Sequence, residues 1–167
     1  GTAWTEGNNL NNARAFGYGL GTQTAALGFG GEPNSAHTES YNGTSWTELN
    51  NLNQGRSALA GAGTTTAGIA FGGTAPARAL AESWNGTSWT EVADLNAARY
   101  GISGAGTGTA ALGFGGFTSP PDTYYNNTET WNGSSWTEVN NMNTARYYTG
   151  GSGTQTEALV FGGEAPP

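Results

Sequence analysis

Short stretches of alternating apolar and polar residues, separated by polar turn residues, run through this chain. Around Phe71, for example, Ile69 and Phe71 fall on the same face of an extended backbone, and small residues fill the stretch before them. Alternation with a period of two is typical of β-strands that are buried on one side. We therefore predict an all-β fold, with strands in this part of the chain at residues 57–64, 66–73, 81–84 and 88–92.

The same pattern occurs four times. Each copy contains Trp-Thr-Glu, then Leu/Met-Asn-x-x-Arg, then a glycine-rich run and Phe-Gly-Gly; the arginines are Arg14, Arg56, Arg99 and Arg146. The copies begin about 42 to 47 residues apart, a period typical of repeats that bury their apolar faces against one another. We assign these repeats, within a single domain, to residues 1–45, 46–88, 89–135 and 136–167.

Glycine occupies every second position of the stretch that follows each arginine, as at Gly104 and Gly106. Glycine weakens an ordinary strand, so a face of glycines usually marks a place where another backbone approaches closely. The next strand supplies large apolar residues on one face, such as Leu27 and Phe29. We expect the glycine strands to be innermost, around a central axis, with the apolar faces stacked between neighbouring sheets.

Three Asn-Gly pairs stand between the later strands of the repeats, at Asn42-Gly43, Asn85-Gly86 and Asn132-Gly133. Asn-Gly is the strongest short hairpin signal, because both central residues of a type I′ turn need a positive φ. We therefore predict a tight type I′ hairpin at each pair.

Phe-Gly-Gly, an aromatic residue, a tryptophan one short turn later, and then Leu/Met and Arg together resemble the kelch repeat of β-propellers. The aromatic residues and tryptophans are Tyr41, Trp84, Trp131, Trp46, Trp89 and Trp136. The resemblance covers nearly the whole chain and implies about four blades, each a four-stranded antiparallel sheet, although the outer hairpin is shorter than in most kelch blades. The near-identical repeats, rich in Gly, Thr and Asn, are also similar to repeat proteins of phages and other environmental viruses.

The kelch strand order places an outermost strand at residues 4–6 and ends the chain within the fourth blade. It implies that the N-terminal strand completes the last blade, because propellers commonly close with strands from both ends of the chain. Two closures are open: a monomeric four-bladed ring, or a head-to-tail homodimer with eight blades in which this chain is one half. We favour the dimer, since kelch blades usually subtend the narrower angle of larger rings.

Charge and composition reduce the number of partner classes that this chain is expected to bind. The chain has five arginines, no lysine, twelve carboxylates and a net charge of −7, which disfavours nucleic acid and anionic membrane surfaces. It has no cysteine and therefore neither disulfides nor thiolate metal sites, and we expect no cofactor and no metal. No apolar run approaches the roughly 20 residues of a membrane span, so we expect a soluble chain. The viral resemblance implies an extracellular or virion-associated location.

The loop after each Phe-Gly-Gly differs from repeat to repeat, whereas the loops inside the hairpins barely change. Variation on one face of a rigid scaffold is typical of a binding surface, and the kelch resemblance implies ligands on this same face. Tyr124 and Tyr125 offer an aromatic platform for a sugar or a peptide, or else pack the long loop against its own scaffold. The candidate ligand-binding residues in these loops are Glu32, His37, Arg78, Phe117, Asp122, Tyr124 and Tyr125.

The four repeated arginines have two interpretations. They could surround a central opening and hold an anion, or each could pair with a glutamate such as Glu39, Glu82 or Glu129 and tie adjoining strands together. We favour the ion pairs, because residues repeated in every blade usually stabilise the blade.

We expect a non-catalytic recognition module that presents its variable loops to a glycan or a protein, as part of a viral or bacterial surface structure. The alternatives are a purely structural, self-assembling repeat protein and, less favoured, a glycoside-acting enzyme. Kelch-type copper oxidases need His, Tyr and Cys, and this chain has one His and no Cys. Its Asn-Gly-x-Ser-Trp turns distantly resemble the aspartate box of sialidases, which is structural there as well. We therefore assign no catalytic residue.

Overall fold

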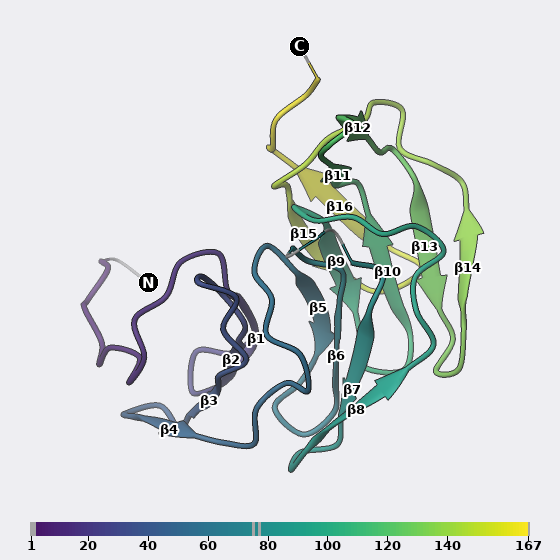
Figure 1. The fold of residues 1–167 in the computed structure, drawn as a ribbon. Helices are drawn as coiled ribbons and strands as arrows, with labels where there is room; N and C mark the ends of the chain where they lie inside the picture. The colour runs from purple at the N-terminus through teal and green to yellow at the C-terminus, as the bar shows by residue number, and fades with distance from the viewer. Residues whose placement is uncertain (1–2, 75, 77, 167) are drawn as a thin grey trace.

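The computed structural model describes residues 3–74, 76 and 78–166, and within them it contains sixteen β-strands and no helix (Figure 1). The prediction of an all-β fold is therefore confirmed. The strands form three four-stranded antiparallel sheets and two two-stranded ones, an arrangement compatible with a β-propeller. In this described part of the chain, no helix exists that is long and apolar enough to cross a membrane.

Each four-stranded sheet has about the length of one repeat, but its fourth strand is the first element of the next assigned repeat. Sheet 1 contains β1 (Tyr18–Thr22), β2 (Ala25–Phe29), β3 (Thr38–Tyr41) and β4 (Trp46–Glu48). Sheet 2 contains β5 (Ala60–Gly63), β6 (Gly68–Phe71), β7 (Ala81–Trp84) and β8 (Trp89–Val92). Sheet 3 contains β9 (Ser103–Gly106), β10 (Ala111–Phe114), β13 (Thr128–Trp131) and β14 (Trp136–Val139). The four predicted strands of the second repeat therefore exist, with β5 and β6 shorter than expected.

The last sheet has only two strands in the described residues. Sheet 4 consists of β15 (Gly150–Gly153) paired with β16 (Ala158–Phe161). Residues 4–6 form no strand, and Trp4 is fully exposed. Completion of the last blade by the N-terminal strand is therefore absent within one chain, because the described residues include no third strand on β16 with which residues 4–6 could pair.

The glycine strands are the first strands of their sheets, and those of sheets 2 to 4 pack closely against the sheet before them. A Cβ atom at Gly104 would lie 2.7 Å from the carbonyl oxygen of Gly61 and 2.8 Å from Cζ of Phe71. A Cβ atom at Gly151 would lie 2.5 Å from the carbonyl oxygen of Gly104. Real Cβ atoms do not approach other atoms so closely, so the predicted close backbone approach is confirmed.

Aromatic rings fill the space between consecutive sheets. Phe29 of sheet 1 meets Trp89 of sheet 2 edge-on at 5.0 Å between ring centroids, and Phe71 meets Trp136 of sheet 3 at 4.8 Å. Both phenylalanines are fully buried. Burial of such a ring stabilises the fold by roughly 1.5–3 kcal/mol, and the apolar faces of sheets 1 and 2 are thus covered by the sheet that follows.

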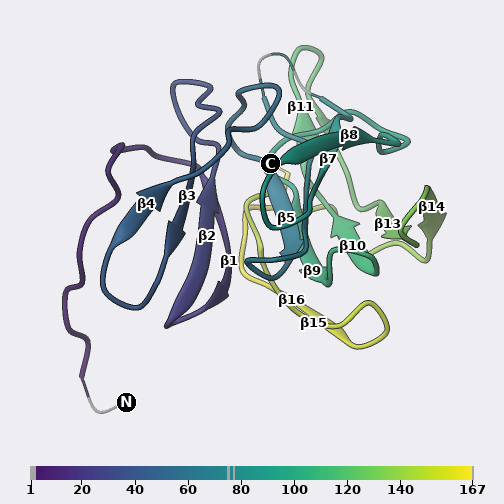
Figure 2. The same ribbon diagram turned by 90° about the horizontal axis from the view of Figure 1, so that it is seen from below.

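The first strands of consecutive sheets lie next to one another. Figure 2 shows β5 and β9 near the middle with β1 beside them, β4, β8 and β14 toward the periphery, and β15 at the lower edge. Just before these first strands, backbone N–H groups donate from Ala58 to Phe16, from Gly101 to Ala58, and from Tyr148 to Gly101, at 2.7–2.9 Å. The rings of Phe16 and Tyr148 then meet at 5.8 Å, so the first and last repeats also touch across the centre.

The prediction of type I′ turns is wrong. Asn42 does not have a positive φ, although Gly43 does (92°), and four residues connect β3 to β4. The side-chain oxygen Oδ1 of Asn42 instead accepts the backbone N–H groups of Thr44 and Ser45, each at 2.9 Å. The asparagine therefore organises a longer turn through its side chain, as Asx residues commonly do.

Candidate functional site

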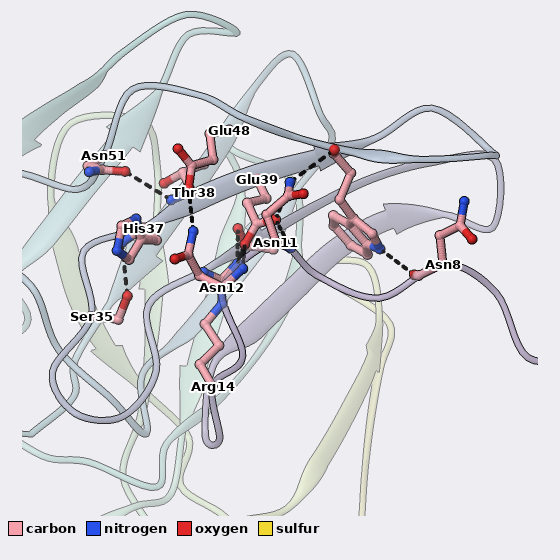
Figure 3. Close-up of polar contacts among 12 residues, drawn as sticks. Asn8, Asn11, Asn12, Arg14, Ser35, His37, Thr38, Glu39, Glu48 and Asn51 are labelled. Carbon is pink, nitrogen blue, oxygen red and sulfur yellow. Dashed lines mark hydrogen bonds and ion pairs between the residues drawn. The ribbon is translucent and has the colours of Figure 1, made fainter.

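Three of the repeated arginines hold a glutamate inside a sheet. In sheet 1, Arg14 lies 3.0 Å from Oε1 of Glu39, and the backbone N–H and side-chain Nδ2 of Asn11 donate to Oε2 at 2.7 and 3.0 Å (Figure 3). Glu39 is completely buried. Each carboxylate oxygen therefore has its own donor, and we call this arrangement the glutamate clamp.

Sheets 2 and 3 contain the same clamp. Arg56 contacts Glu82 at 2.5 Å and Arg99 contacts Glu129 at 2.7 Å, and all four side chains are buried. Burial lowers the pKa of Arg56 and of Arg99, and the paired glutamate opposes this shift. A buried carboxylate with this many donors ties the strands of its sheet together. The ion-pair interpretation of these three arginines is therefore confirmed, and a ring of arginines around the centre is wrong.

Arg146, the fourth arginine, lies in a different environment. Its Nη1 donates to the backbone carbonyl of Gly162 at 3.0 Å. Within the described residues no carboxylate forms an ion pair with it. The reason is that the strand that carries Glu39, Glu82 and Glu129 in the other sheets has no counterpart in sheet 4.

The variable loops lie against the arginine segment of the next repeat. The backbone N–H groups of Gly31, Gly73 and Gly116 donate to backbone carbonyl oxygens at 2.8–3.0 Å. The accepting residues are Arg56, Arg99 and Arg146, in that order. Each loop therefore sits beside the residues that follow the next arginine, at the mouth of the central region. That placement brings the loops and the residues after the arginines to one face.

An aromatic cluster forms on this face around Phe117. The ring of Phe117 lies 4.0 Å from Tyr100, 4.6 Å from Tyr147 and 6.0 Å from Tyr124, with which it is stacked at an interplanar angle of 17°. Tyr148 is 6.0 Å from Phe117 and is 41% exposed. We call Tyr100, Phe117, Tyr124, Tyr147 and Tyr148 the aromatic cluster.

A short hairpin holds part of this cluster. β11 (Phe117–Thr118) pairs with β12 (Thr123–Tyr124), within a segment expected to be an irregular loop. Asp122 accepts a hydrogen bond from the Ser119 hydroxyl at 2.5 Å and thereby braces the turn of the hairpin. Phe117 and Tyr124 are opposite each other in this pairing, which explains their stacking.

Tyr124 and Tyr125 do not form one platform. Consecutive residues of an extended chain point to opposite sides, and here Tyr124 joins the aromatic cluster while Tyr125 lies beside Arg99, whose guanidinium carbon is 5.8 Å from the ring centroid. Tyr125 therefore fits the interpretation that a long loop packs its own tyrosine against the scaffold.

The remaining candidate residues lie in other variable loops. His37 and Glu32 line a cavity of ≈540 Å³ between the first loop and the clamp segment of sheet 1. The backbone N–H of His37 donates to the Ser35 hydroxyl at 3.1 Å (Figure 3). Arg78 lies in the second loop, where its backbone N–H donates to Gly73. The structure thus brings Phe117, Tyr124 and Asp122 together but does not join His37 or Arg78 to them.

Carboxylates surround the aromatic cluster. The pKa of Tyr147 is raised to about 12, and the largest cause is the hydrogen bond that its hydroxyl donates to Glu164 at 2.7 Å. The pKa of Tyr148 is raised by burial and then by the charges of Tyr100, Glu32 and Glu164. Asp122 similarly adds to the effect of burial in raising the pKa of Tyr100. Glu32, Asp122 and Glu164 are therefore close enough to the cluster to raise the pKa of a tyrosine in it.

A smaller cavity of ≈180 Å³ opens at the centre of the same face, between Phe16, Ala58, Gly101 and Tyr148. The sequence interpretation missed these residues and also Tyr100 and Tyr147. A signal was present, because the residues just after the repeated arginines also differ between repeats: Ala15-Phe16, Ser57-Ala58, Tyr100-Gly101 and Tyr147-Tyr148.

No protein-family model and no curated protein sequence matches this chain. The kelch resemblance therefore rests on the repeated sequence motifs and on the all-β arrangement of sheets. In the described residues, no group of three or more His, Cys, Asp or Glu side chains is placed to hold a metal ion.

Proposed function

We propose that this chain is a non-catalytic recognition module of kelch-like propeller architecture that binds an uncharged glycan through its aromatic cluster. The observation that carries the proposal is the concentration of five aromatic rings, partly exposed, where the longest variable loop meets the residues after two of the arginines. A tyrosine ring offers an apolar face and a polar tip, and a sugar ring likewise has C–H faces bordered by hydroxyl groups.

The charges around the cluster support an uncharged ligand. Glu32, Asp122 and Glu164 act on its tyrosines, and the chain as a whole carries a net charge of −7. A sulfated or sialylated glycan would meet repulsion from both. A neutral sugar avoids that cost and can stack on Tyr124 and Tyr148.

The test is a glycan screen followed by calorimetric titration of the best neutral ligand. We expect Tyr124→Ala and Tyr148→Ala each to weaken binding by about tenfold or more, as the loss of an aromatic anchor typically does. Trp4→Ala is the matched control, because Trp4 is fully exposed and belongs to no sheet. Binding that survives both tyrosine substitutions, or that occurs only with a protein ligand, would contradict the proposal.

A second candidate function is head-to-tail assembly, the eight-bladed homodimer being one form of it. Phe29, Phe71 and Phe114 each lie against a glycine of the following sheet, whereas Phe161 is 59% exposed. At the other end, a Cβ atom at Gly19 would meet only the carbonyl oxygen of Leu27, at 3.9 Å. Phe161 and Gly19 are thus the two unused halves of the contact that joins consecutive sheets.

Light scattering distinguishes the two closures. A mass of 17.0 kDa corresponds to one chain, and twice that mass to the eight-bladed dimer. If the dimer forms, Phe161→Ser should return the mass to that of one chain, because the exposed ring is the part that a second copy would cover. A dimer that is unaffected by this substitution would be assembled in another way. Hydrolysis of a glycoside in an activity screen would instead favour the enzyme alternative.

A further inference from the structure

Sheet 4 differs from the other sheets in having a second strand with a free edge. In sheets 1 to 3 the second strand pairs on one side with the glycine strand and on the other with a strand that contains the clamped glutamate. In the described chain β16 pairs only with β15, and Leu159 and Phe161 on it are 71% and 59% exposed. The free edge offers unpaired backbone N–H and C=O groups to an added strand.

The glutamate clamp of the fourth repeat has its donors but lacks its acceptor. In sheets 2 and 3, Asn53 and Asn96 donate through the backbone N–H and through Nδ2 to Oε2 of the glutamate, as Asn11 does in sheet 1. The corresponding residues of the fourth repeat are Asn143 and Arg146, with the same Asn-x-x-Arg spacing. Three filled copies therefore show which side chain the fourth copy is built to bind.

A cavity beside the turn between β15 and β16 provides a second, independent observation. It measures ≈480 Å³ and is lined by Leu112, Thr128 and Val139 of sheet 3 together with Gln155. The equivalent surface of sheet 1 is covered by the outermost strand of the next sheet, where Nε1 of Trp89 donates to the hydroxyl of Thr38 at 2.9 Å. Thr128 stands in the position of Thr38, so the cavity lies where a tryptophan of an outer strand would be accommodated.

We propose that the β16 edge, Asn143, Arg146 and this cavity form a binding site for a segment of another polypeptide with the chemistry of an outer hairpin. The segment carries Thr-Glu-Ser/Thr-aromatic, a turn, and a tryptophan. It pairs antiparallel with β16 in the register of sheet 3, where Phe114 faces Thr128 and Gly113 faces Glu129. Its glutamate enters the empty clamp, and its tryptophan enters the cavity.

The charge of Arg146 and the strand pairing at β16 both favour this ligand. Arg146 is a cation whose three counterparts each hold a carboxylate, so an acidic residue at the centre of the strand is favoured over a neutral or basic one. Val160 stands opposite the glutamate position, where the other sheets have Gly28, Ala70 and Gly113. This larger side chain makes the fourth site narrower than the other three.

The test uses a fluorescent synthetic peptide with the sequence of residues 128–138, the outer hairpin of sheet 3, titrated into the whole chain. We expect saturable binding, together with slower hydrogen exchange of the β16 amides. Replacing the peptide glutamate that corresponds to Glu129 by Gln should weaken binding by about tenfold or more, because the clamp donors lose their charged acceptor. The protein variant Arg146→Gln should cause a similar loss.

A double-mutant cycle separates this contact from a general effect on folding. The Gln peptide should bind Arg146→Gln about as well as it binds the unsubstituted protein, because the contact is already gone. Arg78→Gln, an arginine in another loop, is the matched control and should bind the original peptide normally. Equal binding of the Glu and Gln peptides to the unsubstituted protein would overturn the proposal. So would the absence of peptide binding, or a homodimer that covers β16 and is not displaced by the peptide.

Discussion

The buried ion pairs are the most consequential side-chain contacts in this protein, and Glu82 is the clearest example. Its side chain is fully buried and accepts from Arg56 and Asn53. We predict that Glu82→Gln lowers the free energy of unfolding by about 3 kcal/mol or more, because it leaves the Arg56 charge buried without a partner. Urea denaturation measures the loss. Glu91→Gln, on the exposed side of β8, is the control, and an equal loss in both variants would contradict the role of the clamp.

Glycine is required where two sheets touch, and much less so where no sheet precedes. We predict that Gly104→Ala lowers the free energy of unfolding by about 1–3 kcal/mol, because its Cβ would overlap with Gly61 and Phe71. Gly19 is the equivalent residue of the first repeat, and Gly19→Ala should have little effect in a single chain, since its Cβ would make only an ordinary contact with the carbonyl oxygen of Leu27, at 3.9 Å. Thermal unfolding of both variants provides the measurement, and similar losses would show that the contact between sheets is not as described.

At the scale of single elements, the outer hairpins depend on one asparagine side chain. Oδ1 of Asn85 accepts the backbone N–H groups of Thr87 and Ser88, each at 2.9 Å. We predict that Asn85→Ala destabilises the protein by about 1 kcal/mol, because two turn N–H groups lose their acceptor. Asn85→Asp retains an acceptor oxygen and should be nearly neutral. If Ala and Asp destabilise equally in chemical denaturation, the side-chain oxygen does not organise the turn.

Most elements could be predicted from the sequence because they are repeated. Strand positions, the innermost glycine strands and the arginine–glutamate pairs follow from spacing that recurs in register. The turn type was predicted wrongly, because Asn-Gly was read without the Thr/Ser-Ser that lengthens the loop and supplies N–H donors to the asparagine. The β11–β12 hairpin and the separation of Tyr124 from Tyr125 were missed, because an insertion that occurs once provides no second copy for comparison.

For the whole molecule, the sequence predicted stacked sheets around a centre, and the structure shows that each contact between them has a direction. A phenylalanine of one sheet always meets a glycine of the next, as Phe71 meets Gly104. A directional contact of this kind leaves one unused half at each end, here Gly19 and Phe161. How the N-terminal segment and sheet 4 are completed could not be settled from periodicity, because the same repeat can continue within a ring or between chains.

The central claim, that four sheets surround one centre, is tested most directly by chemical cross-linking of the first repeat to the last. The chain has no cysteine, so Phe16→Cys with Tyr148→Cys creates a unique pair at two rings that lie 5.8 Å apart. With a short bismaleimide, we predict fast linkage within one chain under native conditions, and slower linkage in urea. The variants with only one of the two cysteines are the control, because they can be cross-linked only between two chains. Native linkage that is no faster than in urea would contradict the account and would indicate repeats arranged in a line.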